Sequence, residues 1–458
     1  MDNREKIELF ENMPILKAII KLAIPTVISS LVMVIYNLAD TYFVGMLNNP
    51  VQNAAVTFAA PVLLAFNAVT NLFGVGSSSL MSRALGSKNY KLVKNSSATG
   101  TYLALLCAGL ISVFVTVFAD PLMNGLGVSD VQTRMVTYQY LKWTVMFGAI
   151  PSILNVLFAY IVRAEGSALH ASIGTMSGCL LNIILDPLFI LPAGLNMGAA
   201  GAGLATCLSN CVACIYFLVL LKVKKNKTFV SIHPKDFTLQ KNVIMNICIV
   251  GVPAAIQNLL NVAGMTISTN LISGYDTYAI AAMGITQKVN MIPVQIALGM
   301  GQSVMPLVSY NYSSHNIKRM KEAIFTVIKI ALSFIAVVSV CYYCFSDVII
   351  SAFMEDSTIV LYGGTFLRNY CLGIPFLTTD FIVVNVFQAT GMGKESLIFA
   401  IMRKIVLEIP AMIIWDKIWP MYGLSLSQFT AEFILSIIAL FVLRRLLKKL
   451  DNETSIVR

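Results

Sequence analysis

The sequence predicts an all-α polytopic membrane protein with twelve transmembrane helices in two pseudo-symmetric lobes of six. Hydrophobic residues make up 57% of the 458 residues and charged residues only 12%, whereas a soluble domain carries roughly 25% charge. Inside a bilayer the backbone must satisfy its own hydrogen bonds, so long apolar stretches form helices. The mean hydropathy of +0.78 therefore indicates a membrane protein.

Twelve apolar runs are long enough to cross a bilayer, which requires about 20 residues at roughly 1.5 Å of rise each. Several runs exceed that length, which predicts tilted helices or helices that continue into water. The runs of the first half are 15–46, 53–82, 97–119, 135–162, 168–191 and 198–221. The runs of the second half are 244–273, 279–307, 322–346, 358–389, 396–415 and 421–443.

An internal repeat divides the chain in two. The segment FADPLMNGLG from Phe118 recurs as FSDVIISAFM from Phe345. Positions in the same order, 222 to 228 residues apart, also match: Pro25 with Pro253, 54–55 with 281–282, Gly76 with Gly301, Pro151 with Pro375, Gly166 with Gly391, 185–186 with 407–408, and Gly198 with Gly423. Such repeats are typical of secondary transporters. We expect an N-terminal lobe at 1–222, a cytoplasmic linker at 223–243 and a C-terminal lobe at 244–458.

The distribution of basic residues predicts the orientation. Most lysines and arginines lie in the N-terminal segment, the even-numbered loops and the C-terminal tail, whereas the odd-numbered loops are neutral or acidic. Cytoplasmic loops are the ones enriched in Lys and Arg, so both termini are expected in the cytoplasm of a multi-pass plasma-membrane protein. The net charge of +10 then reflects topology and contact with anionic lipid. A nucleic-acid partner is not expected, because the basic residues form no groove lined with aromatics.

Ionisable side chains inside the apolar runs are the main functional signal, because a charge in hydrocarbon is costly. Asp40 and Asp186 lie near the outer ends of the first and fifth runs, and Thr206 enters the sixth at a similar depth. Asn182 precedes Asp186 by one helical turn and shares its face. Two carboxylates, an amide and a hydroxyl at one depth predict a site for Na⁺ or a proton. The alternative is that each carboxylate is structural and bonds separately to a neighbouring helix.

The second half contributes Lys288, Asp380, Lys404, Glu408 and Glu432. Lys404 and Glu408 are spaced i, i+4 and can neutralise each other along one helix. Lys288 is a candidate counter-ion for Asp380 or Glu408, or it extends outward to water. Glu432 has no partner that the sequence identifies. The 22 methionines suit an adaptable cavity for amphipathic cations, and they equally suit plain bundle packing.

Several motifs occur in a fixed order along essentially the whole chain. They are IPTVISSLVMVIYNLADTYFVG from Ile24, RALGSKN from Arg83, RAEGSA from Arg163, NIILDPLFI from Asn182, GAAGAGLAT from Gly198, GVPAA from Gly251, PLVSYNY from Pro306 and QATGMGK from Gln388. Together they resemble the multidrug and toxic compound extrusion (MATE) transporters, most of all the MepA-like branch. The resemblance implies two six-helix lobes around a V-shaped cavity, and export of organic cations coupled to inward flow of H⁺ or Na⁺ without a resident cofactor. A monomer in a bacterial membrane is expected.

The resemblance also implies roles for particular residues. The family's N-lobe cation-site positions fall on Asp40 and Asp186, and its supporting positions fall on Pro25, Tyr36, Tyr140, Asn155, Asn182 and Thr206. Pro25 and its repeat partner Pro253 would permit helix bending. Asp380 matches an acidic C-lobe position of some members, where substrate contact is expected together with Glu408, Lys288 and Gln257. Some relatives carry a Glu in the seventh run, but this chain offers only Gln257, so coupling there is not expected.

Two other functions are compatible with a polytopic chain. A lipid-linked saccharide flippase of related architecture is the first, although it would usually carry a more cationic cavity for phosphates and extra spans. A polytopic membrane enzyme is the second, and it would usually show clustered carboxylates for Mg²⁺-diphosphate or a His-rich metal set. The sequence shows neither set, so we expect no catalytic residues and no metal centre apart from possible Na⁺ at Asp40 and Asp186.

Overall fold

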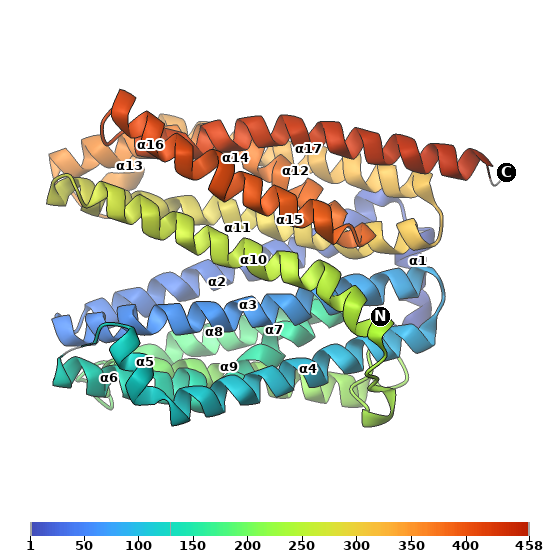
Figure 1. Ribbon diagram of the computed structural model, residues 1–458, viewed down its shortest axis with the longest axis horizontal. Helices are drawn as coiled ribbons and strands as arrows, with labels where there is room; N and C mark the ends of the chain where they lie inside the picture. Colours follow the sequence, from blue (N-terminus) through green and yellow to red (C-terminus); the bar gives the residue numbers. More distant parts are fainter. Residues whose placement is uncertain (1, 129, 457–458) are drawn as a thin grey trace. The chain divides into compact units, whose positions relative to one another are not determined.

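The computed structural model describes residues 2–128 and 130–456, which are almost entirely helical (Figure 1). The chain forms two compact units. The first comprises Met1–Glu8 and Ile28–Ala255, and the second comprises Leu9–Val27 and Ile256–Arg458. Both crossover points lie two residues after the equivalent prolines Pro25 and Pro253. The long helices that carry these prolines therefore each contribute to both units.

The helices of the first half follow one another with short connections, as the apolar runs predict. They are α1 (Asn3–Glu11), α2 (Ile15–Gly45), α3 (Pro50–Gly86), α4 (Tyr90–Val117), α5 (Ala119–Gly125), α6 (Val131–Leu141), the π-helix η1 (Lys142–Phe147), α7 (Ala149–Ala164), α8 (Ala168–Ile190) and α9 (Ala199–Val223). The short 3₁₀ helix η2 (Pro234–Asp236) lies in the connection between the two halves.

The second half repeats this pattern. Its helices are α10 (Lys241–Ile272), α11 (Thr277–Ser313), α12 (Ile317–Cys344), α13 (Ser346–Ser351), α14 (Ser357–Thr390), α15 (Gly393–Ile401), the π-helix η3 (Met402–Glu408), α16 (Ile409–Ile418) and α17 (Gly423–Ile456). Several helices begin before the apolar runs that predict them, since their polar first turns lie outside the hydrophobic stretch.

Within the described ranges, ten helices are long and apolar enough to cross a membrane, or up to eleven if a bent pair counts as one span. The first member of this pair is the continuous segment Val131–Phe147, formed by α6 and η1, and the second member is α7. The two members meet at an angle of 51°. A π-turn interrupts the regular hydrogen-bond ladder, which explains a bend at this point. The predicted run 396–415 also differs from expectation. It is divided into α15, η3 and α16 and carries three charged residues in η3, so it is not one uninterrupted apolar helix.

The repeat is visible in local geometry as well as in sequence. The duplicated motifs from Phe118 and Phe345 form the short helices α5 and α13. Gly166 and Gly391 end α7 and α14 at φ angles of 88° and 79°, a left-handed conformation that glycine adopts without a steric cost. In both turns the glycine N–H donates to the carbonyl three residues earlier, and the N–H of the next residue donates to the carbonyl five residues before it. The two halves are therefore built from the same helix-and-turn plan.

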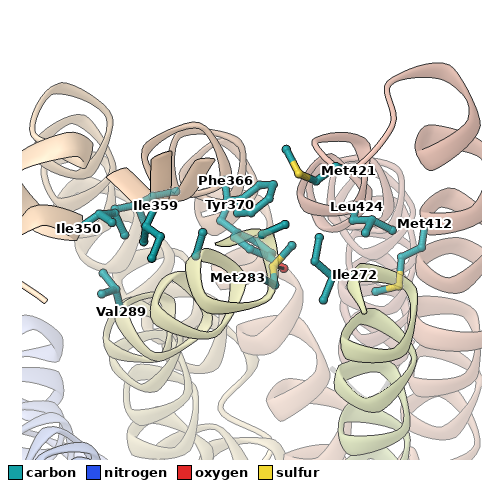
Figure 2. Close-up of a cluster of buried hydrophobic side chains, with 13 residues drawn as sticks. Ile272, Met283, Val289, Ile350, Ile359, Phe366, Tyr370, Met412, Met421 and Leu424 are labelled. Carbon is teal, nitrogen blue, oxygen red and sulfur yellow. Dashed lines mark hydrogen bonds between the residues drawn. The ribbon is translucent and has the colours of Figure 1, made fainter. Parts of the chain in front are cut away.

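Each unit has its own apolar core. In the first unit, Tyr140 lies in a cluster with residues of α2, α3, α4, η1, α8 and α9. In the second unit, Figure 2 shows Met283, Phe366, Tyr370 and Leu424 converging from α11, α14 and α17. Tyr370 satisfies its buried hydroxyl by donating to the sulfur of Met283 at 3.6 Å. These cores pack together the helices that carry the buried polar residues.

Candidate functional site

The first carboxylate of the predicted site lies on α2. Asp40 follows Tyr36 by one helical turn, so both side chains project from the same face. Both side chains are only partly exposed. The Oδ1 atom of Asp40 is buried and has no hydrogen-bond partner among the described residues. A buried carboxylate oxygen without a donor is a position that a cation or a proton can fill.

The second carboxylate lies on α8 and is fully buried. Asp186 is 0% exposed and Asn182, one turn earlier, is 1% exposed. When the Asn182 amide nitrogen faces Asp186, it donates to Oδ2 at 2.8 Å and Oδ1 at 3.2 Å. The amide oxygen then accepts from the backbone N–H of Thr206 on α9 at 3.1 Å. Asn182 therefore fixes the Asp186 carboxylate and ties α8 to α9.

Three side chains that carry hydroxyl groups lie near the two carboxylates. The side chains of Tyr36 and Thr206 are hydrogen-bonded to each other. Tyr140, on α6, interacts electrostatically with both carboxylates, and Asp40 interacts with Asp186. The structure thus places Asp40, Tyr36, Tyr140, Asp186 and Thr206 in one unit, with the interactions described above.

Asn155 reaches this group through a residue that the sequence analysis does not single out. The Asn155 amide on α7 donates to Oδ1 of Asn210 at 2.9 Å, and the Asn210 amide donates to the backbone oxygen of Thr206 at 3.0 Å. Asn210 follows Thr206 by one turn of α9, and that i, i+4 spacing is the signal that identifies it. Asn155 is therefore linked to Thr206 through Asn210 on α9.

The charge of the site is its main chemical property. Among the described residues, neither Asp40 nor Asp186 forms an ion pair, and the neighbours named above are amides and hydroxyls. Two neighbouring carboxylates that are both ionised repel each other, and a proton or a small cation between their oxygens removes that repulsion. No group of three or more His, Cys, Asp or Glu side chains in the described part of the chain has the arrangement of a metal centre. Carboxylate, amide and hydroxyl oxygens are hard ligands, so the donor set suits a proton or a monovalent cation such as Na⁺.

The remaining predicted residues belong to the second unit. Pro25 is inside α2 but belongs to the second unit. Gln257 is half-buried on α10. Lys288 is exposed on α11 and forms no ion pair within the described ranges. It is therefore not the counter-ion of Asp380 or Glu408.

The buried charges of the second unit pair differently from the sequence expectation. Glu408 pairs with Lys404 at 2.6 Å, one helical turn apart, as its spacing predicts. Glu432 pairs with Arg403 at 2.6 Å, a residue that the sequence analysis does not select. The pair joins η3 to α17 across 29 residues, so helix periodicity alone gives no signal for it. Asp380 is 1% exposed, and neither of its carboxylate oxygens has a hydrogen-bond partner among the described residues.

Comparison with known proteins gives a consistent family assignment. The MatE family model matches residues 25–188 and 253–414, one segment in each half. The chain is 30% identical to the multidrug export protein MepA of Staphylococcus aureus (strain MRSA252) and 31% identical to MepA of Staphylococcus haemolyticus, over 98% of each chain.

Solved structures agree with this assignment. One similar structure is the outward-facing conformation of a multidrug resistance MATE family transporter of the MOP superfamily. It has a TM-score of 0.90 and 25% identity, with coverage of 98% of this chain and 99% of that chain. Another, at TM-score 0.89 and 25% identity, is a MOP superfamily transporter from Pyrococcus furiosus described as having a binding pocket of reverse polarity. The match extends over both halves of the sequence, and the chain belongs to the MatE family of membrane transporters.

Proposed function

We propose that this protein exports amphipathic organic cations across the plasma membrane and that inward movement of H⁺ or Na⁺ at Asp40 and Asp186 drives the export. The observation that carries the proposal is the pairing of a fully buried carboxylate with a second one, among amides and hydroxyls and without an ion-pair partner. The MepA relatives are multidrug export proteins, which supports drug export as the activity. Transport, rather than catalysis, is the activity that this site supports.

Coupling follows if the drug and the coupling cation favour opposite conformational states of the transporter. A cation bound between Asp40 and Asp186 removes their mutual repulsion and changes the packing preferred by α2, α6, α8 and α9. The change biases the conformational equilibrium only as far as the cation's affinity differs between the states. A drug that binds the other state more tightly is then exchanged for the cation. Since the same oxygens accept a proton or Na⁺, the site is compatible with either ion.

The cargo is proposed on the basis of charge and composition. The similar transporter from Pyrococcus furiosus is described as having a binding pocket of reverse polarity, so the cargo is argued here from the residues of this chain and not from the fold. In this chain the candidate coupling residues are acidic, and methionine is abundant, with 22 residues. Adaptable apolar side chains with a few polar anchors suit amphipathic cations of varied shape.

A transport assay tests the coupling ion. The purified protein in proteoliposomes is expected to move a fluorescent monocationic dye in response to an imposed proton gradient or an imposed Na⁺ gradient, each applied alone. A response to one gradient identifies the coupling ion. Dye movement that follows neither gradient and equals that of protein-free liposomes would contradict cation-coupled export.

Cysteine labelling tests the proposed topology. With both termini in the cytoplasm, cysteines introduced at Lys225 and Arg445 are expected to react only after permeabilisation of the cell. Cysteines at Asn48 and Glu355 are expected to react with an impermeant reagent in intact cells. The nine native cysteines require a cysteine-free background for this measurement. Labelling of position 225 in intact cells would contradict the proposed orientation.

A further inference from the structure

A small basic pocket of the first unit is not used by the proposed coupling site. It lies where α8 begins and α9 ends, and its lining includes Ser167, His170, Leu220, Lys224 and Thr228. His170 is the third residue of α8, and Lys224 follows the last residue of α9. The pocket is therefore at the end of these helices that the distribution of basic residues predicts to be cytoplasmic.

A chain of hydrogen bonds joins three side chains at this pocket. Nζ of Lys224 lies 2.6 Å from Nε2 of His170, and Nδ1 of His170 lies 3.2 Å from the hydroxyl oxygen of Tyr216 on α9. A lysine ammonium can only donate, so Nε2 accepts and Nδ1 carries the proton that is donated to Tyr216. The Tyr216 O–H and the remaining N–H groups of Lys224 donate to no other described residue. Both side chains therefore have donors available for an anion.

The charge of Lys224 is not neutralised within the pocket. Glu165 lines the same pocket, but its carboxylate pairs with Lys6 at 2.6 Å. It also accepts from Thr228 Oγ1 at 2.8 Å and from Phe229 N at 2.7 Å. Lys224 forms no salt bridge with any described carboxylate. The N-terminus of α8 adds partial positive charge at the same place, so the pocket favours an anionic ligand.

The surface next to the pocket is apolar and exposed. Leu169 and Ile173 lie one turn apart on α8, and Val219 and Val223 lie one turn apart on α9. All four are exposed, Val223 to 77%. Both helices are candidate membrane spans, so this surface faces acyl chains. A negative headgroup above acyl chains is the chemistry of an anionic phospholipid, which basic pockets at the cytoplasmic ends of spans bind.

We propose that Lys224, His170 and Tyr216 bind the headgroup phosphate of an anionic phospholipid whose acyl chains lie against the exposed apolar surface of α8 and α9. Lys224 supplies the charge, Tyr216 donates a hydrogen bond, and His170 positions both. The inference does not depend on the proposed transport activity. Only the assignment to the cytoplasmic leaflet follows from the proposed orientation.

The internal repeat provides a variant that removes the site. At the offset that relates Gly166 to Gly391, His170 corresponds to Glu395 and Lys224 corresponds to Lys449. The second half thus has a carboxylate where the first half has an imidazole. In His170→Glu, the introduced carboxylate would pair with Lys224 and neutralise the charge that the phosphate requires.

Native mass spectrometry of the full-length protein tests the proposal without a transport assay. The purified protein is delipidated in detergent and titrated separately with phosphatidylglycerol, which is anionic, and with phosphatidylcholine, which has a phosphate but no net charge. We expect the first phosphatidylglycerol to bind more tightly than later ones and more tightly than phosphatidylcholine. The measured quantities are the Kd of the first lipid and the shift in Tm that it causes.

Four variants locate the binding site. Lys224→Gln is expected to raise the Kd of the first phosphatidylglycerol about fivefold, the effect of one basic residue close to anionic lipid. His170→Glu is expected to raise it at least as much, and Tyr216→Phe to raise it less. The matched control Lys225→Gln is the same substitution at the adjacent, exposed lysine outside the pocket. We expect it to leave the Kd unchanged.

Other results would overturn the proposal. An equal rise in Kd for Lys224→Gln and Lys225→Gln would show general attraction by basic residues and no defined site. Phosphatidylcholine that binds as tightly as phosphatidylglycerol would remove the role of the headgroup charge. A Tm shift with inorganic phosphate equal to that with phosphatidylglycerol, and lost in Lys224→Gln, would assign the pocket to a soluble anion. The Tm of each variant without lipid reports its folding, and His170→Glu carries the test if Lys224→Gln does not fold.

Discussion

Replacing Asp186 by asparagine is expected to reduce gradient-driven dye export to the level of protein-free liposomes. The substitution preserves the size of the side chain but replaces the carboxylate by a neutral amide. The amide cannot take up and release a proton, and it binds Na⁺ without a compensating negative charge. Asp186 is 0% exposed and held by the Asn182 amide, and no neighbouring carboxylate other than Asp40 shares its interactions. Asp40→Asn is expected to have the same effect. The measurement is the initial rate of dye transport in proteoliposomes under an imposed gradient.

Asp120→Asn is a matched control for these variants. It is the same substitution in the same unit, at an exposed carboxylate that pairs with Arg134 at 2.9 Å. We expect it to retain export, because it lies outside the buried group. Equal export by Asp186→Asn and Asp120→Asn, at equal levels of inserted protein, would contradict a coupling role for Asp186.

The second large effect concerns stability. Replacing Glu165 by alanine is expected to destabilise the protein by about 3–5 kcal/mol, because it leaves a buried charge without its partner. Glu165 is 3% exposed and accepts from Lys6 Nζ at 2.6 Å, Thr228 Oγ1 at 2.8 Å and Phe229 N at 2.7 Å. Lys6 is 1% exposed. The pair ties α1 to the turn after α7 and to the connection between the halves.

This destabilisation is expected to decrease at alkaline pH. Burial lowers the pKa of Lys6 below its usual 10.5, and the Glu165 carboxylate opposes that effect. Without Glu165, the pKa of Lys6 in the folded state falls further below its unfolded-state value. Between the two values the unfolded chain binds more protons, so stability rises with pH. The difference in Tm between the native protein and Glu165→Ala should therefore narrow as pH approaches 10.5.

A double variant separates loss of the pair from loss of packing. Lys6→Met/Glu165→Met replaces both charges by apolar side chains, a change that is often neutral in buried pairs. We expect its Tm in detergent to exceed that of Glu165→Ala. If the double variant were as unstable as the sum of the two single changes, the ion pair would not be the source of the effect.

The fold and the first carboxylate pair could be predicted from sequence because both depend on periodicity. Twenty-residue apolar runs specify helices, and the half-chain repeat specifies two similar sets of them. The depth of Asp40 and Asp186 along their runs, with Asn182 one turn away, predicts that they share one site. Asn210 lies one helical turn after Thr206, as Asn182 lies one turn before Asp186. A neutral amide in an apolar run is not by itself a sign of a site, however, because it carries no charge that needs a partner.

The charged residues of the second unit could not be paired from sequence for a physical reason. Lys404 and Glu408 obey the i, i+4 rule and do pair, so they leave Arg403 without an evident local role. Arg403 lies in the π-helix η3 and Glu432 in α17, so their pairing depends on how these two elements pack against each other. The Lys6–Glu165 pair spans 159 residues and likewise depends on tertiary packing.

The most direct test of the central claim compares two modes of transport in the Asp40→Asn/Asp186→Asn double variant. Dye-for-dye exchange requires only cargo binding and alternating access, whereas uphill dye accumulation also requires coupling to an ion gradient. With the protein reconstituted in proteoliposomes, the double variant is predicted to retain exchange and to lose accumulation under both proton and Na⁺ gradients. Accumulation at the rate of the native protein would contradict the claim that Asp40 and Asp186 couple cation entry to export.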